Sequence, residues 1–200
     1  MFNFYLLSSI LLISLIFFFL GNNRAKKIII LNQKNLHSLT HYYGVYSLLA
    51  SLLPTLGLFF IFTICDDLLF AELIKKYIPE EVVMSKDYNF TIVLAQINNS
   101  VEGLIFGTPP QWVTNAAEIW VSWVHKSQII TVISCISTAL ISGFFGYKKI
   151  NSDFRSRNAV EKIVMYILAV SSVIAILTTI AIIFSVVFES VRFFALIPYD

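Results

Sequence analysis

Four long apolar runs constrain the fold of this chain more than any other feature of its sequence. They cover residues 2–20, 45–65, 127–147 and 163–188, and each is close to or above the roughly 20 residues that a helix needs to cross a membrane. The chain is 58% hydrophobic and 13% charged, whereas about a quarter of the residues of a soluble domain are charged. The sequence therefore predicts an all-α integral membrane protein with four transmembrane helices.

The first run occupies the place of a secretory signal peptide but lacks the flanks of one. Its basic residues follow the run, in "GNNRAKK", and the bulky side chains of Phe17, Phe18 and Phe19 close it. A cleaved signal has a basic segment before the apolar run and small residues at its end. We therefore interpret residues 2–20 as an uncleaved span.

The segments between the runs differ in charge. The first and the last are basic, whereas the middle segment, residues 66–126, carries more acidic than basic residues. The bases of the other two segments are Arg24, Lys26, Lys27, Lys34, Lys148, Lys149, Arg155, Arg157 and Lys162. Cytoplasmic loops collect Lys and Arg. The pattern therefore predicts four alternating crossings, with both basic loops in the cytoplasm and with both termini and the middle segment outside.

This topology divides the chain into four parts. Residues 1–65 contain two transmembrane helices and a basic cytoplasmic loop, and residues 66–126 form an extracytoplasmic loop. Residues 127–162 contain the third transmembrane helix and a basic cytoplasmic turn, and residues 163–200 contain the fourth helix. The extracytoplasmic loop is too long for a tight connection, so we expect it to be partly helical.

Three stretches of the middle segment carry structural signals. "DDLLFAELIKKYIP" has helical spacing, which predicts a helix that starts at Asp66 or Asp67 and ends by Pro79. "NFTIVLAQINNSVEGLIFG" fits a helix or a strand. "TPPQWVTNAAEIWVSWVHK" predicts an amphipathic helix that begins at its Pro pair and leads into the third span. All three tryptophans of the chain lie there, which favours a membrane interface over the alternative of a ligand-stacking site.

Small residues recur in the last two runs, and small residues let helices approach closely. They are Ser134, Ser137, Ala139, Ser142 and Gly143 in the third run and Ala169, Ser172 and Ala175 in the fourth. We expect these faces to pack against protein rather than lipid. Cys65 and Cys135 lie in or at the end of apolar runs, which predicts buried free thiols rather than a disulfide.

No catalytic, cofactor-binding or metal-binding motif stands out in the sequence. His37 and His41 are four residues apart, as metal ligands on one helix face are, but no third ligand lies near them in the sequence. Two interfacial histidines is the favoured interpretation. The four runs contain no Asp, Glu, Lys, Arg or His, and such residues mark ion and proton pathways in membranes. The sequence therefore argues against an enzyme and against a self-sufficient pump.

The stretch "FRSRNAVEKIV", residues 154–164, gathers polar and charged residues between the third and fourth runs. Asn158 followed by Glu161 approximates a capping box, which predicts that Asn158 caps the fourth helix. The bases anchor the loop in the cytoplasm, where they meet anionic lipid; an anion-binding site is the less favoured alternative. The predicted anchors and motif residues are Arg24, Lys26, Lys27, Arg155, Arg157, Asn158 and Glu161.

Three stretches together resemble the N-terminal region of PstC-type phosphate ABC transporter permeases, in the long form with extra N-terminal helices. They are "GNNRA" at 21–25, "LHSLTHYYGVYSLLASLLPTL" at 36–56 and, most specifically, "FRSRNAVEKIVMYILAVSSVIAILTTIAIIFSVVFESVRFFALIP" at 154–198. The resemblance implies the N-terminal membrane module of the permease subunit of an ATP-driven inorganic phosphate importer. The fourth helix is then the start of the permease core.

The same resemblance implies partners and a location. The partners are a second permease subunit, cytoplasmic ATPase subunits, a periplasmic phosphate-binding protein and membrane lipid, with no nucleic acid, and the location is the bacterial inner membrane. The cytoplasmic coupling loop of such permeases has no counterpart here, so we expect a truncated or split permease that does not transport alone. The alternative is a free-standing four-helix membrane scaffold or accessory subunit of a larger complex.

Overall fold

The structure, a computed structural model, describes residues 2–32, 38–84, 89–104 and 108–196. Every regular element in these ranges is helical, which confirms the predicted all-α class. The elements are α1 (Phe2–Asn32), α2 (Thr40–Ile74), η1 (Lys75–Tyr77), α3 (Glu80–Val83), α4 (Phe90–Val101), α5 (Gln111–Lys148) and α6 (Ser156–Leu196). Four of them, α1, α2, α5 and α6, are long and apolar enough to cross a membrane, as predicted.

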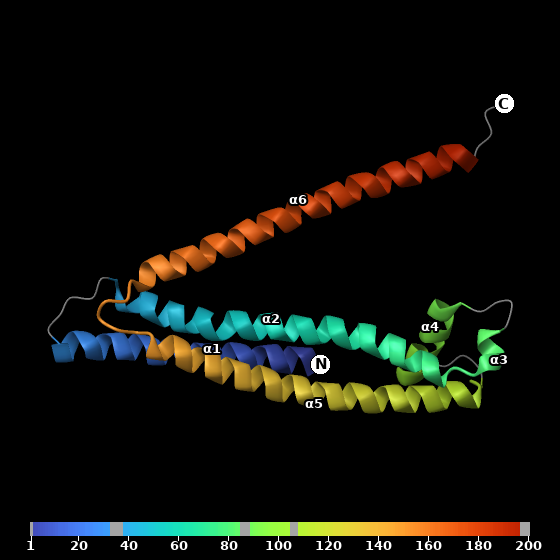
Figure 1. Ribbon diagram of the computed structural model, residues 1–200, viewed down its shortest axis with the longest axis horizontal. Coiled ribbons are helices and arrows are strands. Elements are labelled where there is room, and N and C mark those ends of the chain that lie inside the picture. The colour runs from blue at the N-terminus through green and yellow to red at the C-terminus, as the bar shows by residue number, and fades with distance from the viewer. Residues whose placement is uncertain (1, 33–37, 85–88, 105–107, 197–200) are drawn as a thin grey trace.

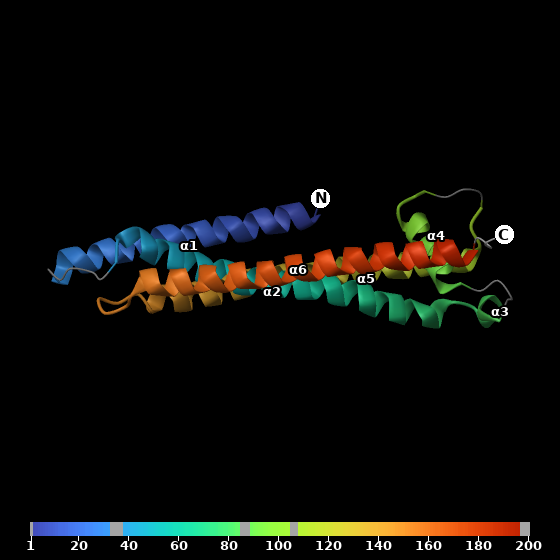
Figure 2. The ribbon, with the colours of Figure 1, turned by 90° about the horizontal axis from the view of Figure 1, so that it is seen from above.

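Helices α1, α2 and α5 run alongside one another as a bundle, and both views show their common direction (Figures 1 and 2). Helix α6 starts beside the beginning of α2 and then diverges from the bundle (Figure 1). The short helices α3 and α4 lie at the opposite end. Every described side chain of α6 from Val164 to Ala195 is exposed, so α6 contacts the rest of the chain only near its base.

The end of the second span differs from the prediction. Asp66 and Asp67 lie inside α2, which continues to Ile74, so the predicted separate helix with an aspartate cap is wrong. An aspartate caps a helix only where the chain enters it, and here the apolar spacing that follows lets the helix propagate. The helical segment still ends before Pro79, because η1 closes at Tyr77.

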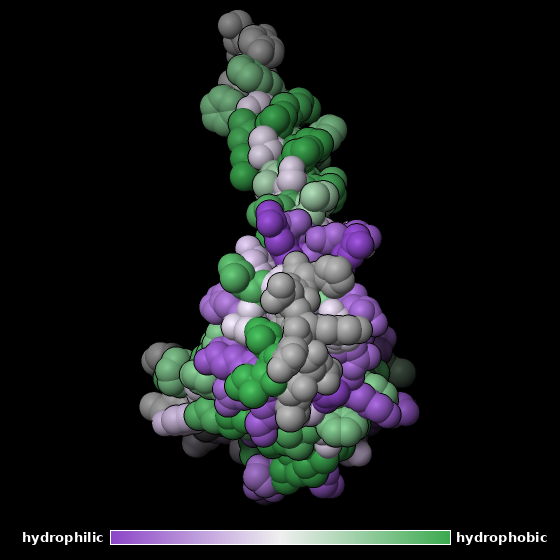
Figure 3. Space-filling view, turned by 90° about the vertical axis from the view of Figure 1, so that its left-hand side faces the viewer, coloured by the Kyte–Doolittle hydropathy of each residue, from purple (hydrophilic) through white to green (hydrophobic). Residues whose placement is uncertain are grey.

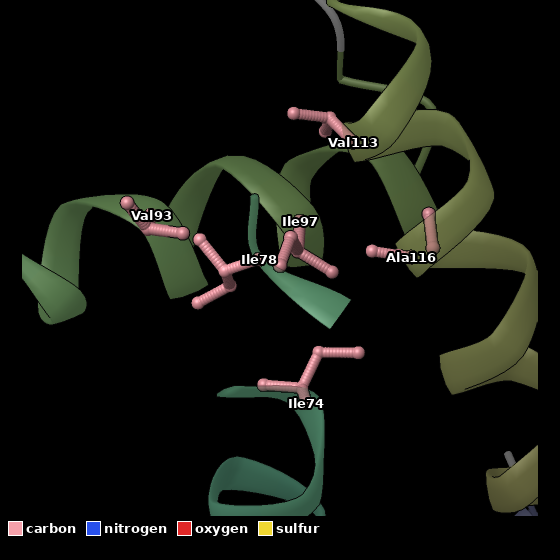
Figure 4. Packing of buried hydrophobic residues seen from close by; sticks show 7 residues of the cluster. Ile74, Ile78, Val93, Ile97, Val113 and Ala116 are labelled. Atoms are coloured by element: carbon pink, nitrogen blue, oxygen red, sulfur yellow. The ribbon is translucent and has the colours of Figure 1, made fainter. Parts of the chain in front are cut away.

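The middle segment forms a second hydrophobic core at that end of the bundle. The ambiguous stretch is a helix, α4, and the Asn89 side chain caps it by accepting the Thr91 N–H at 3.0 Å. Helix α5 begins at Gln111, with Pro110 at the cap position, and runs without a break into the third span. The core joins α2 and Ile78, the residue after η1, to α4 and α5 (Figure 4). Its buried members are Ile74, Ile78, Val93, Ile97, Val113, Ala116 and Ala117.

Small side chains bring the three bundle helices together. A Cβ at Gly21 of α1 would lie 2.5 Å from Ser47 Oγ of α2, so no larger residue fits there without a shift. The Ser51 hydroxyl of α2 donates to the Ala139 carbonyl of α5 at 3.0 Å, and Ser14 Oγ of α1 lies 3.5 Å from Ser51 Oγ. This close approach is the packing expected of helices in lipid.

The predicted small-residue faces have different outcomes. Ala139 and Gly143 of α5 are buried, which confirms protein packing for the third span, although Ser137 is exposed. Ala169, Ser172 and Ala175 of α6 are all exposed, so they do not pack against the described part of this chain, and protein packing of the fourth span stays a prediction.

The two cysteines also differ from each other. Both are free thiols, as predicted, and Cys135 is buried. Cys65 is exposed, which corrects the prediction of a buried thiol there.

Candidate functional site: the base of helix α6

The two basic segments meet at one end of the bundle, which we call the basic end (described residues 21–32, 38–44 and 147–157). The Arg24 guanidinium carbon lies 4.5 Å from the centre of the Tyr147 ring. The Tyr43 hydroxyl donates to the Phe154 carbonyl at 2.7 Å. The middle segment lies at the far end (Figure 1). This arrangement agrees with four alternating crossings, while the side of the membrane that each end faces stays a prediction.

A small core fixes the turn between α5 and α6. Ala25, Tyr43 and Ile150 are fully buried there. The Phe154 ring packs against this core, with its centre 6.2 Å from that of Tyr43 and 4.7 Å from that of Tyr46. Residues from three segments therefore hold the turn in place.

The start of α6 differs from the predicted capping box. The helix begins at Ser156, and the Ala159 N–H donates to the Arg155 carbonyl at 3.2 Å, so Asn158 lies inside the helix and does not cap it. The cap is supplied from elsewhere in the chain, because Ser38 Oγ accepts the Arg157 N–H at 3.2 Å. Such a bond satisfies one of the free N–H groups of a helix start. Local sequence does not predict this cap, because Ser38 and Arg157 are 119 residues apart in the chain.

Glu161 has a different partner from the one that a capping box requires. Its carboxylate accepts from Arg157 Nε at 2.6 Å, one helical turn away. The side chains of Arg157 and Glu161 are 62% and 52% exposed, so this pair adds little stability. The guanidinium of Arg157 is also directed at a carboxylate, which weakens the interpretation of this stretch as an anion site.

The structure brings together some of the predicted anchors but not all of them. Arg24 is half-buried over Tyr147, whereas Lys26 and Lys27 are exposed on α1. A shallow groove at the base of α6 is lined by Ser38, Arg155, Arg157, Asn158 and Glu161. Hydrophilic side chains surround the base of α6 on this end of the molecule (Figure 3).

The sequence did not identify the residues that anchor this site. Tyr43, Phe154 and Ser38 supply its buried contacts and its cap. Tyr43 and Phe154 are 111 residues apart in the chain, so local patterns hold no information on their pairing.

The other candidate residues do not form a chemical site in the described part of the chain. The His41 ring packs edge-on against Phe18 at 5.2 Å, and His37 lies outside the described residues. No group of three His, Cys, Asp or Glu side chains among the described residues is arranged to hold a metal ion. The centre of the Trp123 ring lies 5.9 Å from that of Phe70 and 5.7 Å from that of Tyr77. Trp123 therefore joins α5 to the end of α2 and to η1.

The comparisons with known proteins identify the family. A family model described as "Phosphate ATP-binding cassette transporter" matches residues 7–178, and the chain therefore belongs to this family. The match extends over the bundle, the base of α6 and part of α6 itself. It confirms the predicted relation to phosphate ABC transporters and indicates a membrane protein with a role in transport rather than catalysis. No curated protein and no solved structure matches the chain.

Proposed function

We propose that this member of the phosphate ATP-binding cassette transporter family is the N-terminal membrane module of a PstC-type permease subunit, in an importer of inorganic phosphate. The observation that carries the proposal is the division of the fold at residues 149–155. We assign the bundle before this turn, α1, α2 and α5, to the extra helices of the long-form permeases. Helix α6 after it corresponds to the stretch that resembles the start of the permease core.

The two parts have different surfaces, and the difference fits different roles. The bundle helices pack on one another through Ser51, Ala139 and other small residues. No side chain in the most apolar 18-residue stretch of α6 is buried within the chain. It is held at its base by the Ser38 and Phe154 contacts. We propose that the bundle supports α6 while α6 packs into the permease core.

The proposal includes a place and partners for the chain. The basic loop within residues 1–65 and the basic turn within residues 127–162 face the cytoplasm of a bacterial inner membrane. Residues 66–126 face the periplasm. Part 163–200 enters the core, with its end outside. The partners are a second permease subunit, the cytoplasmic ATPase subunits and the periplasmic phosphate-binding protein.

Co-purification tests this proposal. The tagged full chain, solubilised from its own membrane, is expected to retain the permease core and the ATPase of the phosphate importer. Ser172→Leu adds bulk to the small-residue face of α6 and is expected to reduce that recovery. Ser137→Leu is the matched control, because it makes the same change at an exposed position of α5. Equal recovery with both variants, or purification without the importer, contradicts the proposal.

A free-standing scaffold is the second candidate. The packing of α1, α2 and α5 on one another favours it. The two functions differ in what deletion of the chain does to phosphate uptake. A permease module is required for uptake at any expression level of the other subunits. A scaffold is required only for efficient assembly, so overexpression of the other subunits restores uptake in its absence.

A further inference from the structure

A small cavity lies at the far end of the bundle, where α1 begins and where α2 and α5 leave the predicted apolar runs. Its volume is about 150 Å³. Asp66 of its wall follows directly on the run 45–65, and Ser127, which contacts Asp66, begins the run 127–147. The cavity is therefore at the depth where the hydrocarbon core of a membrane gives way to headgroups.

Aromatic rings form much of the cavity wall. Phe2, Phe59, Phe70 and Trp120 come from three different helices. The Phe70 and Trp120 rings meet edge to face, with centres 5.8 Å apart. The face of an aromatic ring is electron-rich and attracts cations. Several such rings around one space favour a positively charged occupant with apolar substituents.

Some polar side chains of the cavity wall have unused hydrogen-bonding groups. Thr131 is only 5% exposed, and neither it nor Gln128 makes a side-chain hydrogen bond within the described residues. The Asp66 carboxylate accepts a hydrogen bond from the Ser127 hydroxyl. It has no ion pair with any described basic side chain. A negative charge and unused hydrogen-bonding groups therefore line an aromatic space.

The aromatic rings and the single carboxylate of the wall favour some cations over others and disfavour phosphate. Divalent metal ions require several oxygen ligands, with charge from more than one carboxylate in most sites, and Asp66 is the single acid of this wall. Phosphate is disfavoured because the one charged lining group is negative. An organic ammonium matches both parts of the wall, since its charge meets the carboxylate and its alkyl groups meet the rings. A cavity of about 150 Å³ holds a ligand of about the size of benzene.

We propose that this cavity binds an organic ammonium group, with Asp66 as counter-ion and Trp120 and Phe70 as the aromatic face. The shared chemistry fits a free small alkylammonium ion and the headgroup of an ethanolamine or choline lipid. The depth of the cavity gives access to both. This site is independent of the proposed permease function, because it lies at the end of the bundle opposite to the base of α6.

Binding is measured on the purified full chain in a maltoside detergent, which carries no ammonium group. Tetramethylammonium chloride and ethylammonium chloride are titrated by calorimetry, with sodium chloride at equal ionic strength as the blank. Saturable binding is expected in the unchanged chain. Asp66→Asn keeps an acceptor for Ser127 and is expected to weaken binding by about tenfold or more, since it removes the counter-ion. Glu118→Gln, an exposed acid on α5, is the matched control and leaves binding unchanged.

Circular dichroism of each variant establishes that the helices remain. A folded Asp66→Asn variant that binds as tightly as the unchanged chain overturns the proposal, and so does the absence of saturation above the sodium blank. A second change, Trp120→Leu, is expected to weaken binding while Trp120→Phe retains most of it. Nanodiscs distinguish the sources. If phosphatidylethanolamine discs, but not phosphatidylglycerol discs, suppress tetramethylammonium binding, the headgroup is the occupant; if neither does, it is a free cation.

Discussion

The packing of α1 against α2 leads to a quantitative prediction at Gly21. A Cβ added there would lie 2.5 Å from Ser47 Oγ and 2.9 Å from the Tyr43 carbonyl oxygen. The hydroxyl can rotate away, but the backbone oxygen moves only if the two helices separate. Overpacking of this kind costs about 1–3 kcal/mol. Gly21→Ala is therefore expected to lower the stability of the bundle.

Gly57→Ala is the control that isolates the packing cost. Gly57 also lies within a helix, α2, and a Cβ there has no atom within 4 Å. Replacing a mid-helix glycine by alanine gains roughly 0.5–1 kcal/mol in either position, because alanine loses less conformational entropy. That gain cancels when the two variants are compared. The difference between them is then the overpacking cost alone, about 1–3 kcal/mol.

Thermal unfolding in detergent, followed by circular dichroism, measures this difference. For a chain of this size each kcal/mol shifts Tm by roughly 2–4 °C, so Gly21→Ala is expected to melt at least about 2 °C below Gly57→Ala. Adding Ser47→Ala to Gly21→Ala removes the nearer atom but not the backbone oxygen, so a partial recovery is expected. Equal Tm values for the two single variants would refute the close approach of α1 and α2 at Gly21.

Three further predictions concern the basic end and the topology. Tyr43→Phe removes the hydrogen bond to the Phe154 carbonyl, which is expected to cost about 1 kcal/mol and to speed amide exchange in the turn 149–155, measured by mass spectrometry. Single cysteines that replace Asn99 and Asn151 in a cysteine-free chain are expected to react with an impermeant thiol reagent from opposite sides of the membrane; same-side labelling contradicts the four-span topology. Glu161→Gln breaks an exposed ion pair that adds little stability, so Tm is expected to change by no more than about 2 °C, and a larger fall would show that the pair matters.

The sequence predicted those features that depend on composition over long stretches. Runs of about 20 apolar residues identify spans because nothing else satisfies a backbone in lipid. The charge of the loops predicted which segments lie at the same end, and the buried cluster that contains Ala25 and Ile150 confirms that the two basic segments meet. The apolar face of the segment before the third span was also predicted, since Val113 and Ala116 are buried.

Features that depend on distant residues were not predicted. The N-cap was assigned to Asn158 because its neighbours fit a local motif, whereas Ser38 caps the helix from another segment. Helix α2 passes through Asp66 because the residues beyond it are held by the core around Ile97 and Val113, which local capping rules do not include. The aromatic cavity combines rings from three helices, so no local pattern reveals it.

The divergence of α6 is the feature that most favours a partner inside the membrane. Exposure of its apolar side chains is not by itself evidence, because lipid tails are as apolar as leucine and cover such a helix at no cost. Its direction is more informative. A helix tethered to a bundle by the short turn 149–155 gains contacts by lying along it, yet α6 departs from it after its first two turns (Figure 1). The Ser38 and Phe154 contacts join the base of α6 to the start of α2. Ala169, Ser172 and Ala175 therefore do not pack on the bundle. These small residues are available for contact with the helices of the proposed permease core.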